Sequence, residues 1–187
     1  MCVVIHKPAG IKITSHTLER CWNVNSDGAG IMYAQNDALH IHKGMMEFDE
    51  FYKFYSEHID KDMLIHFRLA SDGEINKGMT HPFLVFPGLG VMHNGILNLS
   101  STRHYLSLHK KFSDTYAFVL NVLSKLPQDF LYNEGIVKLL MDAVDGSTLV
   151  FMDSTGKINI IGNYAETVIY EGCWFSNKYW MVDEDEN

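Results

Sequence analysis

Residues 1–6 read Met-Cys-Val-Val-Ile-His, so a cysteine lies between the initiator methionine and a short apolar run. Removal of Met1 would leave a thiol and a free α-amine on one residue, Cys2. Because an α-amine titrates near about 7.7–8.0 and a thiol near about 8.5, the amine can accept the thiol proton near neutral pH. Cysteine is also a common buried residue. The stretch therefore predicts either a nucleophile or the start of a core strand.

Composition restricts the class of protein. A chain of 187 residues that is 47% hydrophobic predicts one globular domain over residues 1–187. The net charge of −8 argues against a nucleic-acid partner, because phosphate binding requires clustered Lys and Arg. The chain has one visible run of like charge, at about residues 183–187, which predicts a solvated acidic tail. No apolar run approaches the roughly 18 residues of a membrane span, so no membrane association is expected.

The cysteines and histidines predict no metal site and no disulfide framework. Cys2, Cys21 and Cys173 form an odd set without C-x-x-C spacing, which favours a reducing, cytoplasmic location. His40 and His42 share a face of a predicted strand, but no third ligand follows at a fixed spacing. Neither a P-loop nor a dinucleotide-binding glycine motif is present, and no cofactor is expected.

Hydrophobic periodicity predicts strands first, then helices, then strands again. The strands are expected at residues 2–6, 30–34, 38–43, 63–69, 83–86, 90–92, 148–152, 157–161, 167–170 and 173–175. The helices are expected at residues 46–58, 114–126 and 133–144. This order indicates an α+β layered domain rather than a doubly wound parallel sheet.

Candidate binding chemistry is concentrated between residues 66 and 82. Arg68 lies within an apolar run, and a buried guanidinium needs an anion because it cannot lose its charge. That anion is either an internal carboxylate or a ligand. Ser71 places a hydroxyl beside the arginine, whereas His81, held extended by the following proline, is more typical of a hydrogen-bonded structural residue.

Two further sites each allow a structural and a functional interpretation. Asn94-Gly95 at the end of an apolar strand predicts a tight turn, but the same dipeptide can aim an amide N–H and a backbone N–H at an oxyanion. Asp114 follows Ser113 at the predicted start of a helix. It is either a helix cap or a group that holds a ligand ammonium.

In this order the pieces resemble the class II glutamine amidotransferase domain, the N-terminal-nucleophile (Ntn) type of glutaminase. The stretches that carry the resemblance are Cys2, Asp27-Gly28-Ala29-Gly30, His66 to Gly73, His81-Pro82, His93-Asn94-Gly95 and Ser113-Asp114-Thr115. The resemblance spans Cys2 to Thr115. It implies an Ntn-hydrolase-like αββα four-layer sandwich with two stacked, mainly antiparallel sheets.

The resemblance also implies a mechanism for glutamine hydrolysis. Cys2, after removal of Met1, would attack the side-chain amide of glutamine with its own α-amine as base and later as acid. Asn94 and Gly95 would form the oxyanion hole. The resulting γ-glutamyl thioester would be hydrolysed by water, with release of ammonia.

The remaining motif residues are expected to bind the substrate. Arg68 matches the arginine that binds the α-carboxylate of glutamine, and Asp114 matches the carboxylate that receives the α-ammonium. Ser71 stands where the family usually has threonine, and its hydroxyl would contact glutamine. His81 and His93 are assigned to the wall of the site.

Departures from the family pattern indicate a divergent, stand-alone member. Residues 24–27, Val-Asn-Ser-Asp, supply no arginine where many synthase-linked members have one, and Leu69 and Asp72 replace common family residues. Such a chain is expected to hydrolyse glutamine and to supply ammonia to an acceptor on a partner protein. Two alternatives are an Ntn amidase for γ-glutamyl or other small amides, and a catalytically silent binding module. Retention of Met1 would block the α-amine and both enzymatic routes.

Overall fold

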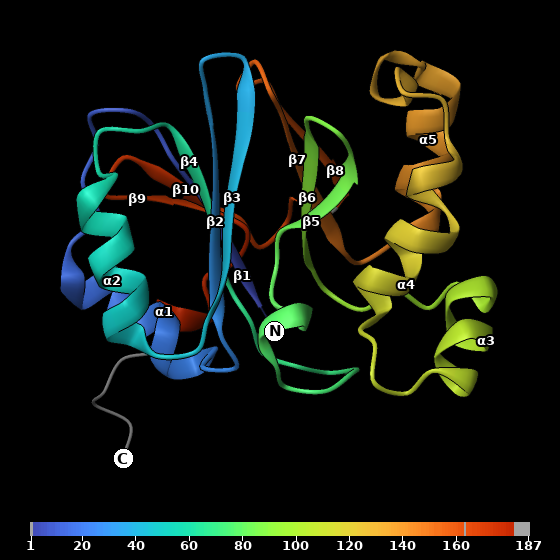
Figure 1. The fold of residues 1–187 in the computed structure, drawn as a ribbon, viewed down its shortest axis with the longest axis horizontal. Coiled ribbons are helices and arrows are strands. Elements are labelled where there is room, and N and C mark those ends of the chain that lie inside the picture. Colours follow the sequence, from blue (N-terminus) through green and yellow to red (C-terminus); the bar gives the residue numbers. More distant parts are fainter. Residues whose placement is uncertain (1, 163, 182–187) are drawn as a thin grey trace.

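Two antiparallel sheets stack face to face, and helices cover both outer faces (Figure 1). The structure is a computed structural model that describes residues 2–162 and 164–181, so the predicted acidic tail lies outside the described residues. This arrangement confirms the predicted α+β, four-layer αββα sandwich.

Ten strands form the two sheets. The first sheet contains, in spatial order, β3 (Ala38–Met45), β2 (Ala29–Gln35), β4 (Met63–Phe67), β1 (Val3–Lys7), β10 (Cys173–Phe175) and β9 (Val168–Tyr170). The second contains β5 (Phe83–Phe86), β6 (Leu89–Asn94), β7 (Thr148–Asp153) and β8 (Ile158–Gly162). Each of these strands lies where the sequence predicts one.

The helices divide between the two outer faces (Figure 1). Beside the six-stranded sheet lie α1 (Ser15–Val24) and α2 (Phe48–Glu57), and beside the four-stranded sheet lie α3 (Ser100–Leu108), α4 (Asp114–Asn121) and α5 (Glu134–Ala143). Short 3₁₀ turns occur at Lys77–Met79, Leu123–Lys125, Phe130–Tyr132 and Tyr179–Met181. No described helix is long and apolar enough to cross a bilayer.

The helix predictions needed two kinds of correction. The predicted helix 114–126 ends at Asn121, because Val122 adopts a non-helical backbone and the chain continues as a 3₁₀ turn. The sequence analysis did not predict α1 and α3. Both helices are more polar than α2, α4 and α5, so their apolar residues indicate a helix less clearly. The N-cap of α1 was a missed signal, because the Thr14 side chain accepts the Thr17 N–H.

Alternation along the strands divides the core into three apolar layers. Val3 and Ile5 of β1 pack toward α1 and α2, whereas Val4 packs between the sheets together with Leu64 and Met92. A third layer fills the space between the four-stranded sheet and its helices. Because side chains of a strand alternate between its two faces, the register of each strand determines which layer it fills.

Gly30 of β2 illustrates how closely the two sheets approach. A Cβ at this position would lie 1.9 Å from the backbone oxygen of His81. Glycine is therefore needed here for the close contact between two backbone segments.

We expect Gly30→Ala to lower the free energy of unfolding by about 1–3 kcal/mol, because overpacking forces the backbone to shift. Gly135→Ala on α5 is the control, since its Cβ would meet only the side-chain oxygen of Asn133, at 3.3 Å. Alanine at a helical position costs less than glycine by roughly 0.5–1 kcal/mol, so this variant should be at least as stable as wild type. Denaturant titration of the three proteins measures both effects. Equal stability of Gly30→Ala and wild type would contradict the packing argument.

Candidate functional site

Strand alternation places several predicted site residues between the sheets, at one end of the sandwich. Val4 and Leu64 face this inter-sheet layer. The residue two positions before Val4 is Cys2, and the residues two and four positions after Leu64 are His66 and Arg68. Because the pairing of β1 with β4 sets Val3 opposite Phe67, Cys2 lies next to the segment that follows β4.

A small cavity brings together seven of the eight predicted site residues. They are Cys2, Arg68, Ser71, His81, His93, Gly95 and Asp114. Its volume is about 20 Å³, enough for roughly one water molecule. The eighth residue, Asn94, lines a neighbouring cavity instead.

The Cys2 thiol contacts the backbone that follows Arg68. The Leu69 N–H donates to Cys2 Sγ over 3.3 Å, and the Leu69 carbonyl lies 3.3 Å from the same sulfur. Burial raises the pKa of the thiol, and the hydrogen bond from Leu69 lowers it by a smaller amount. Proton removal from Cys2 therefore requires a base.

Arg68 is buried without an ion-pair partner among the described residues. Only 2% of its surface is exposed, and its Nη1 and Nη2 donate to the backbone carbonyls of Glu74 and Asp72, at 3.1 and 3.0 Å. Burial lowers its pKa. Of the two interpretations that the sequence left open, an internal salt bridge is not found in the described chain. The guanidinium instead keeps N–H donors available in the cavity.

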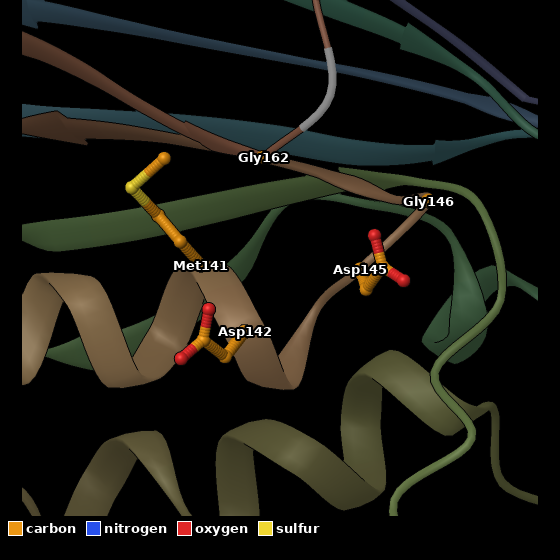
Figure 2. A pocket seen from close by; sticks show the side chains of 5 residues that line it. All are labelled: Met141, Asp142, Asp145, Gly146 and Gly162. Atoms are coloured by element: carbon orange, nitrogen blue, oxygen red, sulfur yellow. The ribbon is translucent and has the colours of Figure 1, made fainter.

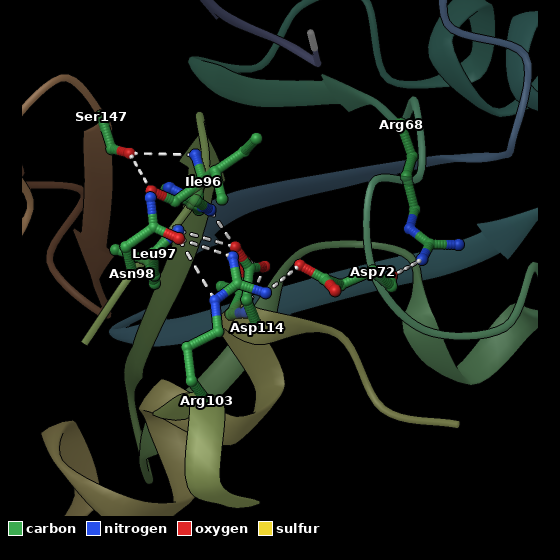
Figure 3. Close-up of polar contacts among 10 residues, drawn as sticks. Arg68, Asp72, Ile96, Leu97, Asn98, Arg103, Asp114 and Ser147 are labelled. Carbon is green, nitrogen blue, oxygen red and sulfur yellow. Dashed lines mark hydrogen bonds and ion pairs between the residues drawn. The ribbon is translucent and has the colours of Figure 1, made fainter. Parts of the chain in front are cut away.

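The loop 69–76 is attached on both sides of the cavity. Asp27 Oδ2 accepts the Ala70 N–H at 2.7 Å. Arg103 of α3 forms an ion pair with the Asp72 carboxylate at 2.9 Å and also donates to Asn98 Oδ1 (Figure 3). Asp72 thus contacts both arginines, because its backbone carbonyl accepts from Arg68 and its carboxylate pairs with Arg103. Sequence analysis missed Arg103 because α3 itself was not predicted.

Asp114 begins α4 and lies in the cavity wall. Its Oδ2 accepts the backbone N–H of Leu97 at 2.8 Å, and its Oδ1 accepts the backbone N–H of Thr115 (Figure 3). The neighbouring Ser113 is the N-cap and accepts from the Tyr116 N–H, as its sequence position predicts. The Asp114 carboxylate is therefore fixed in position while it remains part of the cavity.

Asn94 and Gly95 lie at the end of β6 and line two different cavities. Asn94 is 6% exposed, and its buried Oδ1 has no hydrogen-bond partner among the described residues. Gly95 has a φ of +132°, and a Cβ there would lie 2.3 Å from Ser147 Oγ. The absence of a Cβ allows Ser147 to pack closely against Gly95, which itself lines the Cys2 cavity.

Three buried histidines lie together at the cavity, and two of them, His81 and His93, form part of its wall. His66 Nε2 is 3.0 Å from the carbonyl of His93, His93 Nδ1 is 2.9 Å from Thr115 Oγ1, and the rings of His66 and His81 lie 4.1 Å apart. Burial lowers the pKa of all three rings, that of His66 to about 3. The prediction of a hydrogen-bonded His81 is wrong, because neither ring nitrogen has a partner among the described residues. The His81 ring packs against those of His66 and Phe83.

A larger cavity, of about 510 Å³, lies at the C-terminal end of α5. Met141, Asp142, Asp145, Gly146 and Gly162 line it (Figure 2). It contains none of the predicted site residues. Within the described chain, no group of three or more His, Cys, Asp or Glu side chains is arranged to hold a metal ion.

Solved structures share this fold at low sequence identity. Glutamine phosphoribosylpyrophosphate amidotransferase from B. subtilis, solved with ADP and GMP, matches 97% of this chain with a TM-score of 0.58 and 14% identity. The chain spans only 43% of that protein. A glutamine aminotransferase class-II domain protein from Silicibacter pomeroyi matches 94% of this chain and 87% of its own length, with a TM-score of 0.50 and 12% identity. No protein-family model and no curated protein sequence matches the chain. These similarities confirm the class II amidotransferase-like fold.

The buried, neutral His66 predicts a stability that falls in acid. Its folded pKa of about 3 lies below the unfolded value of about 6.5, so the unfolded chain binds a proton that the folded protein excludes. The contribution of neutral His66 to the free energy of unfolding is therefore fully present above about pH 6.5 and decreases as the pH falls toward about 3. Lowering the pH from 7 to 5 should reduce the free energy of unfolding by about 2 kcal/mol through His66 alone.

Denaturant titrations of wild type and His66→Gln at pH 7 and pH 5 test this expectation. Glutamine retains an N–H donor but does not titrate, so the difference between the two pH values should shrink by about 2 kcal/mol. His104→Gln, at an exposed position of α3, is the control and should keep the wild-type difference. An unchanged pH dependence in His66→Gln would contradict the buried neutral state.

Proposed function

We propose that this protein hydrolyses the side-chain amide of glutamine with Cys2 as the nucleophile, as the glutaminase component of an amidotransferase. One observation carries the proposal: Arg68 is buried beside Cys2 and Asp114 in one cavity, and no described carboxylate pairs with it. A buried guanidinium without an internal anion is suited to an anionic ligand. The shared fold supports the same assignment.

The two charged side chains would hold the amino-acid end of glutamine. A guanidinium has five N–H donors, and Arg68 uses one on each Nη for loop carbonyls, so others remain for the substrate α-carboxylate. Asp114 would accept the α-ammonium with oxygen lone pairs that the Leu97 and Thr115 N–H groups leave free. Glutamine exceeds the present cavity of about 20 Å³, so the loop 69–76 must move outward during binding.

Cys2 would carry the chemistry after Met1 is removed. Burial raises the pKa of its thiol, and the α-amine on the same residue is the base that the reaction needs. Sulfur attacks the amide carbon, and the protonated amine then gives its proton to the departing nitrogen, which releases ammonia. Water hydrolyses the thioester to glutamate and frees the thiol. The Leu69 N–H stabilises the thiolate before attack.

Asn94 and Gly95 would stabilise the tetrahedral oxyanion. Gly95 lines the Cys2 cavity, so its N–H would be one donor, and the Asn94 amide would supply the second. The unpaired Asn94 Oδ1 would accept a hydrogen bond from the α-amine of Cys2. One asparagine would therefore orient both the base and the oxyanion.

We also propose that the ammonia is used by an acceptor-bearing partner protein in the cytoplasm. All three cysteines are free thiols, as expected where disulfides do not persist. Purification from the native host with identification of any chain that accompanies the protein would name the acceptor chemistry.

Cys2→Ala should abolish ammonia release from glutamine, with a loss of at least about 10³-fold in kcat. Cys173→Ala is the control, because burial raises the pKa of that thiol to about 11 and it lies in the core. Intact mass must first show that the active protein lacks Met1. Equal rates for wild type and Cys2→Ala, or activity with Met1 retained, would exclude the proposed nucleophile. Absence of glutamine hydrolysis by wild type without Met1 would favour the silent binding module.

Arg68→Gln should raise the KM for glutamine roughly 100-fold, because charged hydrogen bonds contribute about 1.5–3 kcal/mol. Arg68→Lys keeps the charge but not the two-pronged geometry, so an intermediate KM is expected. Hydrolysis of 4-aminobutanamide, which lacks the α-carboxylate, should change little in either variant. If the hydrolysis of both substrates decreased equally, Arg68 would have a structural role rather than a role in binding the substrate α-carboxylate.

A further inference from the structure

A second cavity adjoins the catalytic one at the end of β6. Its volume is about 250 Å³, and its wall includes Asn94, Thr148, Glu166, Ser176, Asn177 and Tyr179. Gly95, the next residue after Asn94, lines the catalytic cavity. The two consecutive residues of the proposed oxyanion hole therefore line different cavities.

This cavity lies beside the backbone of the nucleophile. Asn177 Nδ2 donates to the Cys2 carbonyl at 2.7 Å, and Ser176 Oγ accepts the Val4 N–H at 2.9 Å. Residues 176–177 thus run along the start of β1 and also line the cavity. Since the α-amine belongs to Cys2, the departing nitrogen that it protonates must leave near this backbone.

The cavity is too large for ammonia alone. Ammonia is similar in size to water, whose share of liquid volume is about 30 Å³. A space of about 250 Å³ accommodates an amine with several carbon atoms.

The charges around the cavity favour a cation. Glu166 lines it, and Gly146 also borders the 510 Å³ cavity that contains Asp142 and Asp145 (Figure 2). No Lys or Arg is among the described residues that line either space. Lys178 lies 3.6 Å from Glu166, but both side chains are largely exposed and such pairs contribute only about 0–1 kcal/mol. A ligand ammonium can therefore replace it.

We propose that this cavity binds the amine half of a γ-glutamyl amide whose amine carries a second, cationic nitrogen. This inference rests on the proposed function, because the same Cys2 would cleave the amide. The C–S bond forms first and gives the tetrahedral oxyanion. The C–N bond then breaks as the α-ammonium gives its proton to the departing amine, and water converts the thioester to glutamate and the free thiol. The substrate class is thus wider than glutamine and includes γ-glutamyl derivatives of diamines.

Three substrates test the proposal with the wild-type protein lacking Met1: glutamine, γ-glutamyl-butylamide and γ-glutamyl-(4-aminobutyl)amide. The two amides have the same chain length and differ in the terminal ammonium. Glutamate release should be at least about 10-fold more efficient in kcat/KM for the cationic amide than for the neutral one, which corresponds to about 1.4 kcal/mol. Cys2→Ala should abolish all three reactions.

Variants that remove a negative charge then test whether this cavity binds the terminal ammonium of the amide. Glu166→Gln and Asp145→Asn should reduce the preference for the cationic amide while glutamine hydrolysis stays at the wild-type rate. Asp49→Asn, on the exposed face of α2, is the matched control and should change neither.

The outcomes separate this inference from the proposed function. Cys2-dependent hydrolysis of glutamine without cleavage of either amide would overturn the amine site and leave the glutaminase intact. Equal efficiency for the two amides, or a preference that survives in Glu166→Gln and Asp145→Asn, would also overturn it. Failure to cleave any of the three substrates would overturn both.

Discussion

The antiparallel pairing of β1 with β4 determines where the site can form. Val3 lies opposite Phe67, so the first residue before β1 meets the first residues after β4. This register places Cys2 Sγ against the Leu69 N–H, one residue beyond Arg68. A slip of one residue would send Val3 and Ile5 into the inter-sheet layer and turn Cys2 away from the arginine. The apolar layers on both faces of β1 prevent such a slip, because each side chain of Val3, Val4 and Ile5 is fully buried.

Arg68 brings an electrostatic constraint to this geometry. Its charge is buried, so the surrounding backbone must supply acceptors, and the loop 69–76 curves back to place two carbonyls on the guanidinium. Asp27, Asp72 and Arg103 then hold the loop in that shape. The histidines at the site remain neutral because burial lowers their pKa, so they add no second positive charge next to Arg68. No carboxylate among the described residues forms an ion pair with Arg68, although Asp27 and Asp114 lie near enough to raise its pKa.

Much of the fold is predictable from local patterns. The strands follow from alternation and turn chemistry, and Asn36 and Asp37, both at positive φ, form the hairpin turn between β2 and β3. The helices α1 and α3 were not predicted because they are more polar than the other three, so fewer apolar residues mark a helix face. Arg103 was missed together with α3. An arginine on a helix that is not recognised gives no indication that it contacts Asp72, more than 30 residues earlier.

The sequence by itself determined the order of the elements, the α+β class and the residues with suitable chemistry, because periodicity and residue type are local properties. Only the tertiary structure decided how those residues combine. It showed that Arg68 has no described acidic partner and that Asn94 and Gly95 line different cavities. It also showed that the ring nitrogens of His81 have no hydrogen-bond partner among the described residues. These outcomes depend on which distant segments meet a side chain after the two sheets pack, and no local pattern specifies that contact.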